Sequence, residues 1–286
     1  MIGFFDSGSG GLTIMNGCRK VMPDISFVYL GDHANAPYGH RDNQAIVALT
    51  KAGVSALFSE GCTVVVLACN TAAAVALRSL QQDWLQKTWP GRNILGVLVP
   101  MVEAVSGVNW ANIEPSEQSQ KDARNILLFA TRKTVESGAY VEELAKRAPN
   151  INLIQKACPG LVDAIEGGAG VLPISGLIQG YVDEVRERLG RCELDAAILG
   201  CTHFPMVENI FQSALGKEVP LYSQPQMVAE TLLDYVAAHP EYKMDKSGGL
   251  RLLSTSEQSN IKGWDRGLQE LSTQAHPDIF FEQIKL

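Results

Sequence analysis

The sequence has no hydrophobic run that approaches the length of a membrane-spanning helix, and its N-terminus lacks the basic and apolar regions of a signal peptide. Positive charge is also scarce, since 24 lysines and arginines stand against 31 aspartates and glutamates, for a net charge of -7. No basic surface for nucleic acid is therefore expected. These absences predict a cytoplasmic protein that acts on neither membranes nor nucleic acid.

Cysteine is sparse and scattered. The six cysteines are Cys18, Cys62, Cys69, Cys158, Cys192 and Cys201. No two of them form a C-x-x-C pair, which argues against a zinc knuckle, a redox pair or a disulfide framework. Cysteines in proteins are mostly small buried residues, so a catalytic role for any of them has to be argued from its surroundings.

Short apolar runs alternate with helical periodicity in the first part of the chain. Residues 2–6 (I-G-F-F-D) predict a strand, which a glycine-rich turn and a helix follow. Further apolar runs at 27–30 and 63–68 flank a helical pattern over 44–60, and the second run stops at Cys69. Strands that alternate with helices predict a parallel sheet in an α/β fold.

The pattern stops at a polar stretch, 105–124, and then restarts. We interpret this stretch as a connection or an inserted loop between two lobes. After it the sequence predicts strands over 126–130, 151–157 and 196–200 and helices over 135–147 and 173–189.

The end of the chain, from about residue 210, has helical stretches at 226–238 and 264–272. We expect it to return and pack on the first lobe. The predicted first lobe is therefore 1–98 plus 210–286, and the predicted second lobe is 99–209.

The two halves echo each other in sequence. F-F-D-S (4–7) falls opposite L-F-A-T (128–131), and V-L-A-C-N-T (66–71) falls opposite I-L-G-C-T-H (198–203). Two similar βαβ units would also give such an echo. Because ligands bind beyond the carboxyl ends of parallel strands, two facing lobes would present both strand-end cysteines to one molecule. We predict two pseudo-symmetric lobes, each a mainly parallel sheet flanked by helices, with the active site in the cleft between them.

Both strand-end cysteines have surroundings that favour a thiolate. Cys69 is followed by Asn70 and Thr71, and a helix start there offers free N–H groups and a favourable dipole. Cys201 is followed by Thr202 and His203, and the imidazole adds a group that can relay a proton. Buried packing is the alternative role for both thiols.

The glycine-rich turn F-D-S-G-S-G-G (5–11) has neither a G-x-G-x-x-G register nor a G-K-[ST] lysine, which disfavours nucleotide binding. We expect its N–H groups and Ser7 to bind a carboxylate at a helix N-terminus, with Asp6 close to Cys69. Helix capping is the alternative role for Asp6 and Ser7. The loop 31–39 contains P-Y-G, which suits a fixed turn that approaches a ligand.

Six motifs in order resemble the glutamate racemase family of the aspartate/glutamate racemase superfamily. They are F-D-S-G-S-G-G (5–11), G-D...P-Y-G (31–39), A-C-N-T-A (68–72), T-x-x-T-x-x-S-G-A-Y (131–140), A-C-P (157–159) and L-G-C-T-H (199–203). The resemblance covers the chain to about residue 225. It departs at Asn35, where arginine is common, at His40, where a small hydroxyl residue is usual, and at Tyr222, where aspartate commonly precedes the serine.

The resemblance implies that Cys69 and Cys201 are the catalytic acid and base. It implies auxiliary roles for Asp6 beside Cys69 and for Glu166 and His203 beside Cys201. The substrate-binding residues that it implies are Asp6, Ser7, Tyr38, Gly39, Asn70, Thr71, Thr202 and His203. It further implies a small-molecule substrate, glutamate, with no cofactor and no metal, and D-glutamate as a product for peptidoglycan synthesis; a homodimer is left open.

In the mechanism that this pair predicts, one cysteine as thiolate removes the Cα proton and the other, as thiol, delivers a proton to the opposite face. Three alternatives remain. An aspartate or hydantoin racemase would use the same pair on another side chain. A non-catalytic binding or regulatory protein would need neither thiol. A cysteine hydrolase is disfavoured because it needs only one.

Overall fold

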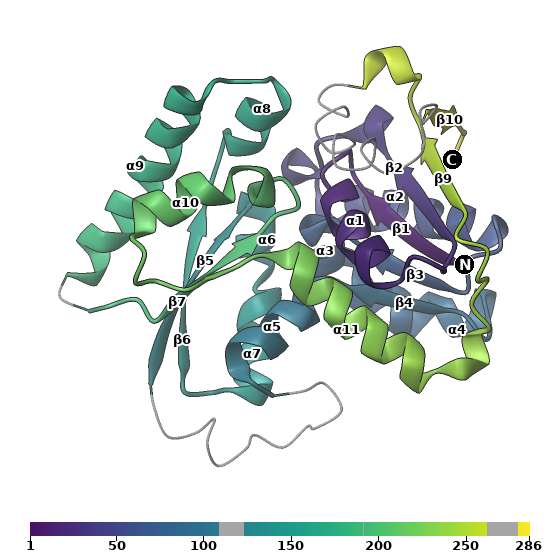
Figure 1. Ribbon diagram of the computed structural model, residues 1–286, viewed down its shortest axis with the longest axis horizontal. Helices are drawn as coiled ribbons and strands as arrows, with labels where there is room; N and C mark the ends of the chain where they lie inside the picture. Colours follow the sequence, from purple (N-terminus) through teal and green to yellow (C-terminus); the bar gives the residue numbers. More distant parts are fainter. Residues whose placement is uncertain (109–122, 191, 262–279) are drawn as a thin grey trace.

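The chain forms two parallel β-sheets, each flanked by helices (Figure 1). The computed structural model describes residues 1–108, 123–190, 192–261 and 280–286. One sheet has six strands in the order β10-β9-β2-β1-β3-β4, and the other has four in the order β6-β5-β7-β8. All pairs in both are parallel. We call the six-stranded sheet with its helices the first lobe and the four-stranded sheet with its helices the second lobe. The predicted fold class is confirmed.

The first lobe is built around strands that are buried on both faces. Its strands are β1 (Ile2–Asp6), β2 (Phe27–Gly31), β3 (Val64–Leu67), β4 (Asn93–Gly96), β9 (Leu250–Ser254) and β10 (Phe281–Gln283). Its helices are α1 (Leu12–Val21), α2 (Asn43–Ser59), α3 (Asn70–Ser79), α4 (Gln86–Thr88) and α11 (Gln224–Ala238). Every residue of β1, β2 and β3 is buried, as expected for central strands of a sheet that helices cover on both sides.

The second lobe follows α5 (Leu98–Ser106). Its strands are β5 (Arg124–Ala130), β6 (Ile151–Ala157), β7 (Ala196–Gly200) and β8 (Leu221–Tyr222). Its helices are α6 (Arg132–Ser137), α7 (Ala139–Arg147), α8 (Leu161–Glu166), α9 (Val171–Leu189) and α10 (Glu208–Leu215). The single helix predicted over 135–147 is two helices, because Gly138 adopts a left-handed conformation with φ 69° and ends α6.

The chain returns to the first lobe later than residue 210. Helix α10 packs on α9, and β8 pairs with β7, so the segment up to Tyr222 completes the second sheet. The return begins with α11, which packs on α1. The predicted helix over 264–272 and most of the polar stretch 105–124 lie outside the described residues. The division into two separate domains stays a prediction.

The sequence echo corresponds to a structural one. The order β2-β1-β3-β4 matches β6-β5-β7-β8. The register matches too, since Phe5 pairs with Leu67 while Phe129, its counterpart, pairs with Leu199. Cys69 and Cys201 therefore follow equivalent strands at equivalent positions. In the part of the chain that the structure describes, no helix is long and apolar enough to span a membrane.

Candidate active site

A cavity of about 710 Å³ lies between the two lobes and holds both strand-end cysteines. The predicted site residues that line it are Ser7, Tyr38, Gly39, Cys69, Asn70, Thr71, Cys201, Thr202 and His203. Two further predicted residues, Asp6 and Glu166, do not line it: Asp6 directly precedes Ser7 in the chain, and Glu166 is hydrogen-bonded to His203. These predicted residues come from four of the six motifs, and the other two motifs also reach the cavity, through Thr131 and through Cys158 and Pro159.

Cys69 caps the N-terminus of α3. Its sulfur accepts a hydrogen bond from the N–H of Ala72 at 3.4 Å and donates one to the Ser7 hydroxyl at 3.5 Å. Burial raises the pKa of the Cys69 thiol to about 12, and the nearby charge of Asp6 adds to this. At neutral pH Cys69 is therefore a thiol with a proton to give.

Asp6 ends β1 and is fully buried. Its Oδ2 accepts a hydrogen bond from the N–H of Gly8 at 2.9 Å, while Oδ1 has no hydrogen-bond partner among the described residues. Burial raises the pKa of Asp6, although His203 and the N–H groups of the glycine-rich turn oppose this. The carboxylate that the turn holds is therefore the one from Asp6. We expected the turn to contact a substrate carboxylate instead. Ser7 is the one residue of the turn that lines the cavity.

Gly10 of the turn lets the two lobes approach each other closely. A Cβ at Gly10 would lie 2.4 Å from Oγ1 of Thr202 and 2.6 Å from the His203 ring. Beside it, the Thr13 hydroxyl donates to the Thr202 carbonyl at 3.1 Å. The first-lobe turn is thus packed directly against the second-lobe segment that carries Cys201.

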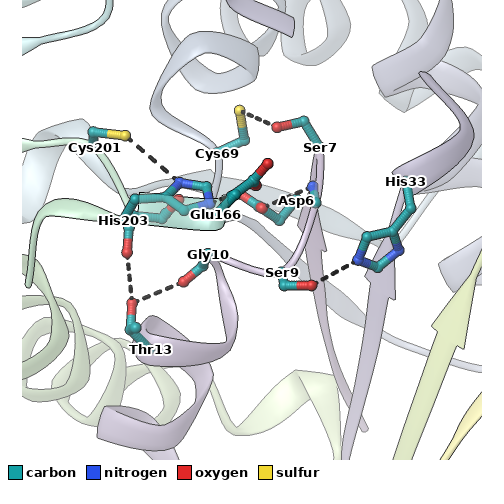
Figure 2. Close-up of polar contacts among 12 residues, drawn as sticks. Asp6, Ser7, Ser9, Gly10, Thr13, His33, Cys69, Glu166, Cys201 and His203 are labelled. Carbon is teal, nitrogen blue, oxygen red and sulfur yellow. Dashed lines mark hydrogen bonds and ion pairs between the residues drawn. The ribbon is translucent and has the colours of Figure 1, made fainter. Parts of the chain in front are cut away.

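His203 connects Cys201 to Glu166 (Figure 2). Its Nδ1 lies 3.9 Å from the Cys201 sulfur, and its Nε2 lies 2.8 Å from Oε1 of Glu166. Burial lowers the pKa of His203, but the hydrogen bonds to Cys201 and Glu166 outweigh burial and raise it well above its usual value. Burial likewise opposes ionisation of Glu166, yet the bond to His203 lowers its pKa. The positive charge of the imidazolium therefore lies beside the Cys201 sulfur.

Three hydroxyl groups meet across the cleft. Thr71 on α3 lies 3.0 Å from Thr131 and 3.4 Å from Thr134, which are themselves 3.0 Å apart. Thr131 also lines the cavity and caps α6. The sequence analysis did not select Thr131 as a site residue, although its alignment opposite Ser7 in the repeat was a usable signal.

Asn70 and Tyr38 reach the cavity with their polar ends already occupied. The Asn70 amide exchanges two hydrogen bonds with Gln224, at 2.8 and 3.0 Å, and accepts a third from Tyr140 at 3.1 Å. The Tyr38 hydroxyl donates to Asp32 at 2.6 Å. What Asn70 offers a ligand is its backbone N–H, since the first N–H groups of a helix have no partner within it.

Charged side chains at the cavity rim were also missed by the sequence analysis. They include Arg41, Arg132 and Lys133, together with Asp42 and Glu136. The Arg41 guanidinium donates to the Asn35 carbonyl at 2.6 Å. The resemblance led us to expect arginine at position 35. Asn35 stands there instead, and its carbonyl binds Arg41 at the rim. Within the described ranges, no group of three or more His, Cys, Asp or Glu side chains is placed to hold a metal ion.

Comparison with known proteins identifies the family of this chain. No protein-family model matches the sequence. The chain is 45% identical over 263 residues to the glutamate racemase of Paracoccus denitrificans, covering 92% of this chain and 94% of that one. It is 42% identical over 261 residues to the glutamate racemase of Jannaschia sp., covering 91% and 93%.

Solved structures give the same result. Glutamate racemase isoform RacE1 from Bacillus anthracis superposes with a TM-score of 0.80 at 25% identity, over 100% of this chain and 97% of that one. The Francisella tularensis glutamate racemase, in complex with D-glutamate, shares the fold with a TM-score of 0.77 at 24% identity, over 99% and 97%. The aspartate racemase of Picrophilus torridus is more distant, with a TM-score of 0.52 at 18% identity, over 84% and 98%. With its amino-acid-racemase fold, paired strand-end cysteines and relatives above 40% identity along nearly its whole length, the chain belongs to the glutamate racemase family.

Proposed function

We propose that this enzyme interconverts L- and D-glutamate without a cofactor, using Cys69 and Cys201 as the two acid–base groups. The observation that carries the proposal is the placement of both thiols at equivalent strand ends in one cavity. The names of its relatives support glutamate as the substrate, and a structure of this fold holds D-glutamate. D-Glutamate made in this way would supply peptidoglycan synthesis.

The electrostatics of the site favour one starting state. Cys69 is buried beside Asp6 and keeps its proton, whereas the Cys201 sulfur lies beside His203, whose raised pKa keeps a positive charge there. In this state Cys201 removes the Cα proton from one face of glutamate, and Cys69 delivers its own proton to the other face. Turnover leaves Cys69 as thiolate and Cys201 as thiol, which is the state that accepts the opposite enantiomer.

The carbanion needs stabilisation that the chain's own dipoles provide. Asn70 and Thr71, which carry the first N–H groups of α3, line the cavity together with Ser7 and Thr131. Donors of this kind bind the substrate carboxylate and stabilise the charge that spreads onto it in the transition state.

The test uses freshly reduced enzyme and L-glutamate in deuterated water with no added cofactor. We expect loss of optical rotation, with deuterium entering the D-product before it appears in the remaining L-glutamate, because the thiol that protonates the product exchanges with solvent. Deuterium that enters both enantiomers together from the start would instead indicate one shared base. No racemisation of L-glutamate would overturn the proposal, and turnover of L-aspartate alone would favour the aspartate racemase alternative.

Cysteine variants assign the roles. We expect Cys69→Ser and Cys201→Ser each to lose racemisation by at least about 10³-fold, because a serine hydroxyl is a far weaker acid at these positions. Cys192→Ser is the matched control, since this cysteine is exposed and does not line the cavity. Normal turnover in either active-site variant would contradict the two-base assignment, and it is what a non-catalytic role for the thiols predicts.

A further inference from the structure

The last residue of β9 and the residue after it carry two hydroxyl groups that reach toward the active-site loops of the first lobe. Strand β9 lies between β2 and the edge strand β10 (Figure 1). Ser254 is paired in register with Gly31 of β2. The Ser254 side chain is fully buried, and Thr255 follows it. This segment lies beyond the part of the chain in which the family motifs occur.

Thr255 contacts the loop that carries the P-Y-G motif. Its hydroxyl donates to Oδ1 of Asp32 at 2.8 Å and accepts the N–H of Ala34 at 3.0 Å. Asp32 is fully buried and also accepts hydrogen bonds from Tyr38 at 2.6 Å and from Asn35 at 3.0 Å. Three neutral donors therefore satisfy this buried carboxylate, and one of them comes from the end of β9.

Ser254 contacts the glycine-rich turn through an imidazole. Its hydroxyl lies 2.9 Å from Nδ1 of His33, whose Nε2 lies 2.9 Å from the Ser9 hydroxyl (Figure 2). Burial lowers the pKa of His33 to about 4, so the ring is neutral near pH 7. A neutral imidazole has one donor and one acceptor nitrogen, so it links the two hydroxyls in a defined direction. Phe281 of β10 packs edge-on against this ring at 5.3 Å.

We propose that Ser254 and Thr255 are positioning residues for racemisation. Thr255 acts through Asp32 to hold Tyr38 and Gly39 at the cavity, and Ser254 acts through His33 to hold the glycine-rich turn. Neither hydroxyl touches the cavity, and each is one contact away from a residue that belongs to a substrate loop. The kinetic test of this inference rests on the proposed function. The hydrogen-exchange test rests only on how well the loop is ordered.

The first test compares Thr255→Val with Thr255→Ser. Valine keeps the shape of threonine but removes its donor, which leaves the buried Asp32 carboxylate with two partners instead of three. We expect kcat/KM for glutamate to fall by about tenfold, mainly through KM, because the displaced loop binds substrate and carries neither thiol. Serine keeps the hydroxyl and should restore most of the loss. Ser256→Ala is the matched control, since none of the described side chains is hydrogen-bonded to that hydroxyl, and its activity should stay at the wild-type level.

A double-mutant cycle tests the route through Asp32. Tyr38→Phe removes the hydroxyl that shares this carboxylate with Thr255. If Thr255 acts by fixing Tyr38, Thr255→Val should cost less in the Tyr38→Phe background than in the wild type, so the two losses will not add. Additive losses would overturn this route.

Hydrogen exchange tests the same inference without any substrate. Backbone N–H groups in 33–41 should exchange about tenfold faster in Thr255→Val than in Thr255→Ser, with β5 and β7 unchanged. Equal protection of 33–41 in both variants would overturn the proposal, whether or not the enzyme racemises glutamate. Failure of the wild type to racemise glutamate, with the loop effect present, would overturn only the proposed function.

Discussion

At the scale of single residues, the two halves of the repeat differ where they meet the two thiols. Asp6 ends β1, and its counterpart in the second lobe is Ala130. Thr71 stands two residues after Cys69, and its counterpart after Cys201 is His203. One sulfur therefore lies near the Asp6 carboxyl group and the other near the His203 imidazole, so the repeated framework gives the two cysteines different electrostatic surroundings.

Changing Glu166 to glutamine tests what keeps His203 protonated. The pKa of His203 is raised, so its positive charge is present below that pKa and lost as the pH rises through it. Removing the Glu166 charge lowers the pKa of His203, so the alkaline limb of the kcat/KM profile should move to lower pH, by about one unit. Glu187→Gln, on an exposed face of α9, is the control. An unmoved alkaline limb in Glu166→Gln would show that Glu166 does not sustain the imidazolium.

At the scale of helices and strands, close backbone contact decides which glycines matter. Helix α1 crosses α11 at Gly17, where a Cβ would lie 2.4 Å from the Pro225 carbonyl oxygen. Gly180 lies within α9, and a Cβ there would meet nothing within 4 Å. A side chain therefore cannot fit at Gly17 without moving the backbone, whereas one fits freely at Gly180.

Alanine substitutions should separate these two glycines. Gly17→Ala is expected to lower the free energy of unfolding by about 1–3 kcal/mol, because backbone atoms cannot yield to the added methyl group. Gly180→Ala should raise it by up to about 1 kcal/mol, since alanine has the higher helix propensity. Urea unfolding of both variants measures the difference. A Gly17→Ala protein as stable as the wild type would mean that α1 and α11 can separate at no cost.

The same scale shows what the sequence alone could predict. Strand β7 (Ala196–Gly200) was predicted to the residue, because a buried parallel strand is an apolar run that ends at turn residues. Strand β6 (Ile151–Ala157) was also predicted to the residue, although only Ile151 in it is buried. Strands β9 and β10 were not predicted, since these short strands at one end of the sheet are specified by the neighbours they pair with. The contact of Thr71 with Thr131 was likewise missed, because it exists only once the lobes have packed.

At the scale of the whole molecule, a buried amide cluster ties the lobes together beside the active site. Asn70 comes from α3, Gln224 from α11 and Tyr140 from α7 of the second lobe. All three residues are nearly or fully buried. Because Asn70 directly follows Cys69, the cluster also fixes the helix start that the Cys69 sulfur caps.

Two substitutions in this cluster should differ in cost. Gln224→Leu removes the acceptor of the Asn70 amide and leaves a buried donor unpaired, so it should destabilise the protein by about 1–3 kcal/mol. Tyr140→Phe removes one donor while Gln224 still serves the same oxygen, so about 0.5–1.5 kcal/mol is expected. Thermal unfolding and racemase activity measured on both variants check this order. A larger loss in Tyr140→Phe would place the main tie between the lobes in the tyrosine rather than in the amide pair.

The matching registers of the two half-sheets are the expected mark of an internal duplication. Mirror-image substrates have equal free energies in water, so a catalyst that interconverts them has no reason to favour either. A duplicated scaffold treats both enantiomers alike from the start, because exchanging L- for D-substrate is equivalent to exchanging the roles of the two cysteine-bearing copies. Later divergence, such as Asp6 opposite Ala130, can then determine which cysteine is protonated in the free enzyme. The equilibrium between the two enantiomers stays at equal amounts.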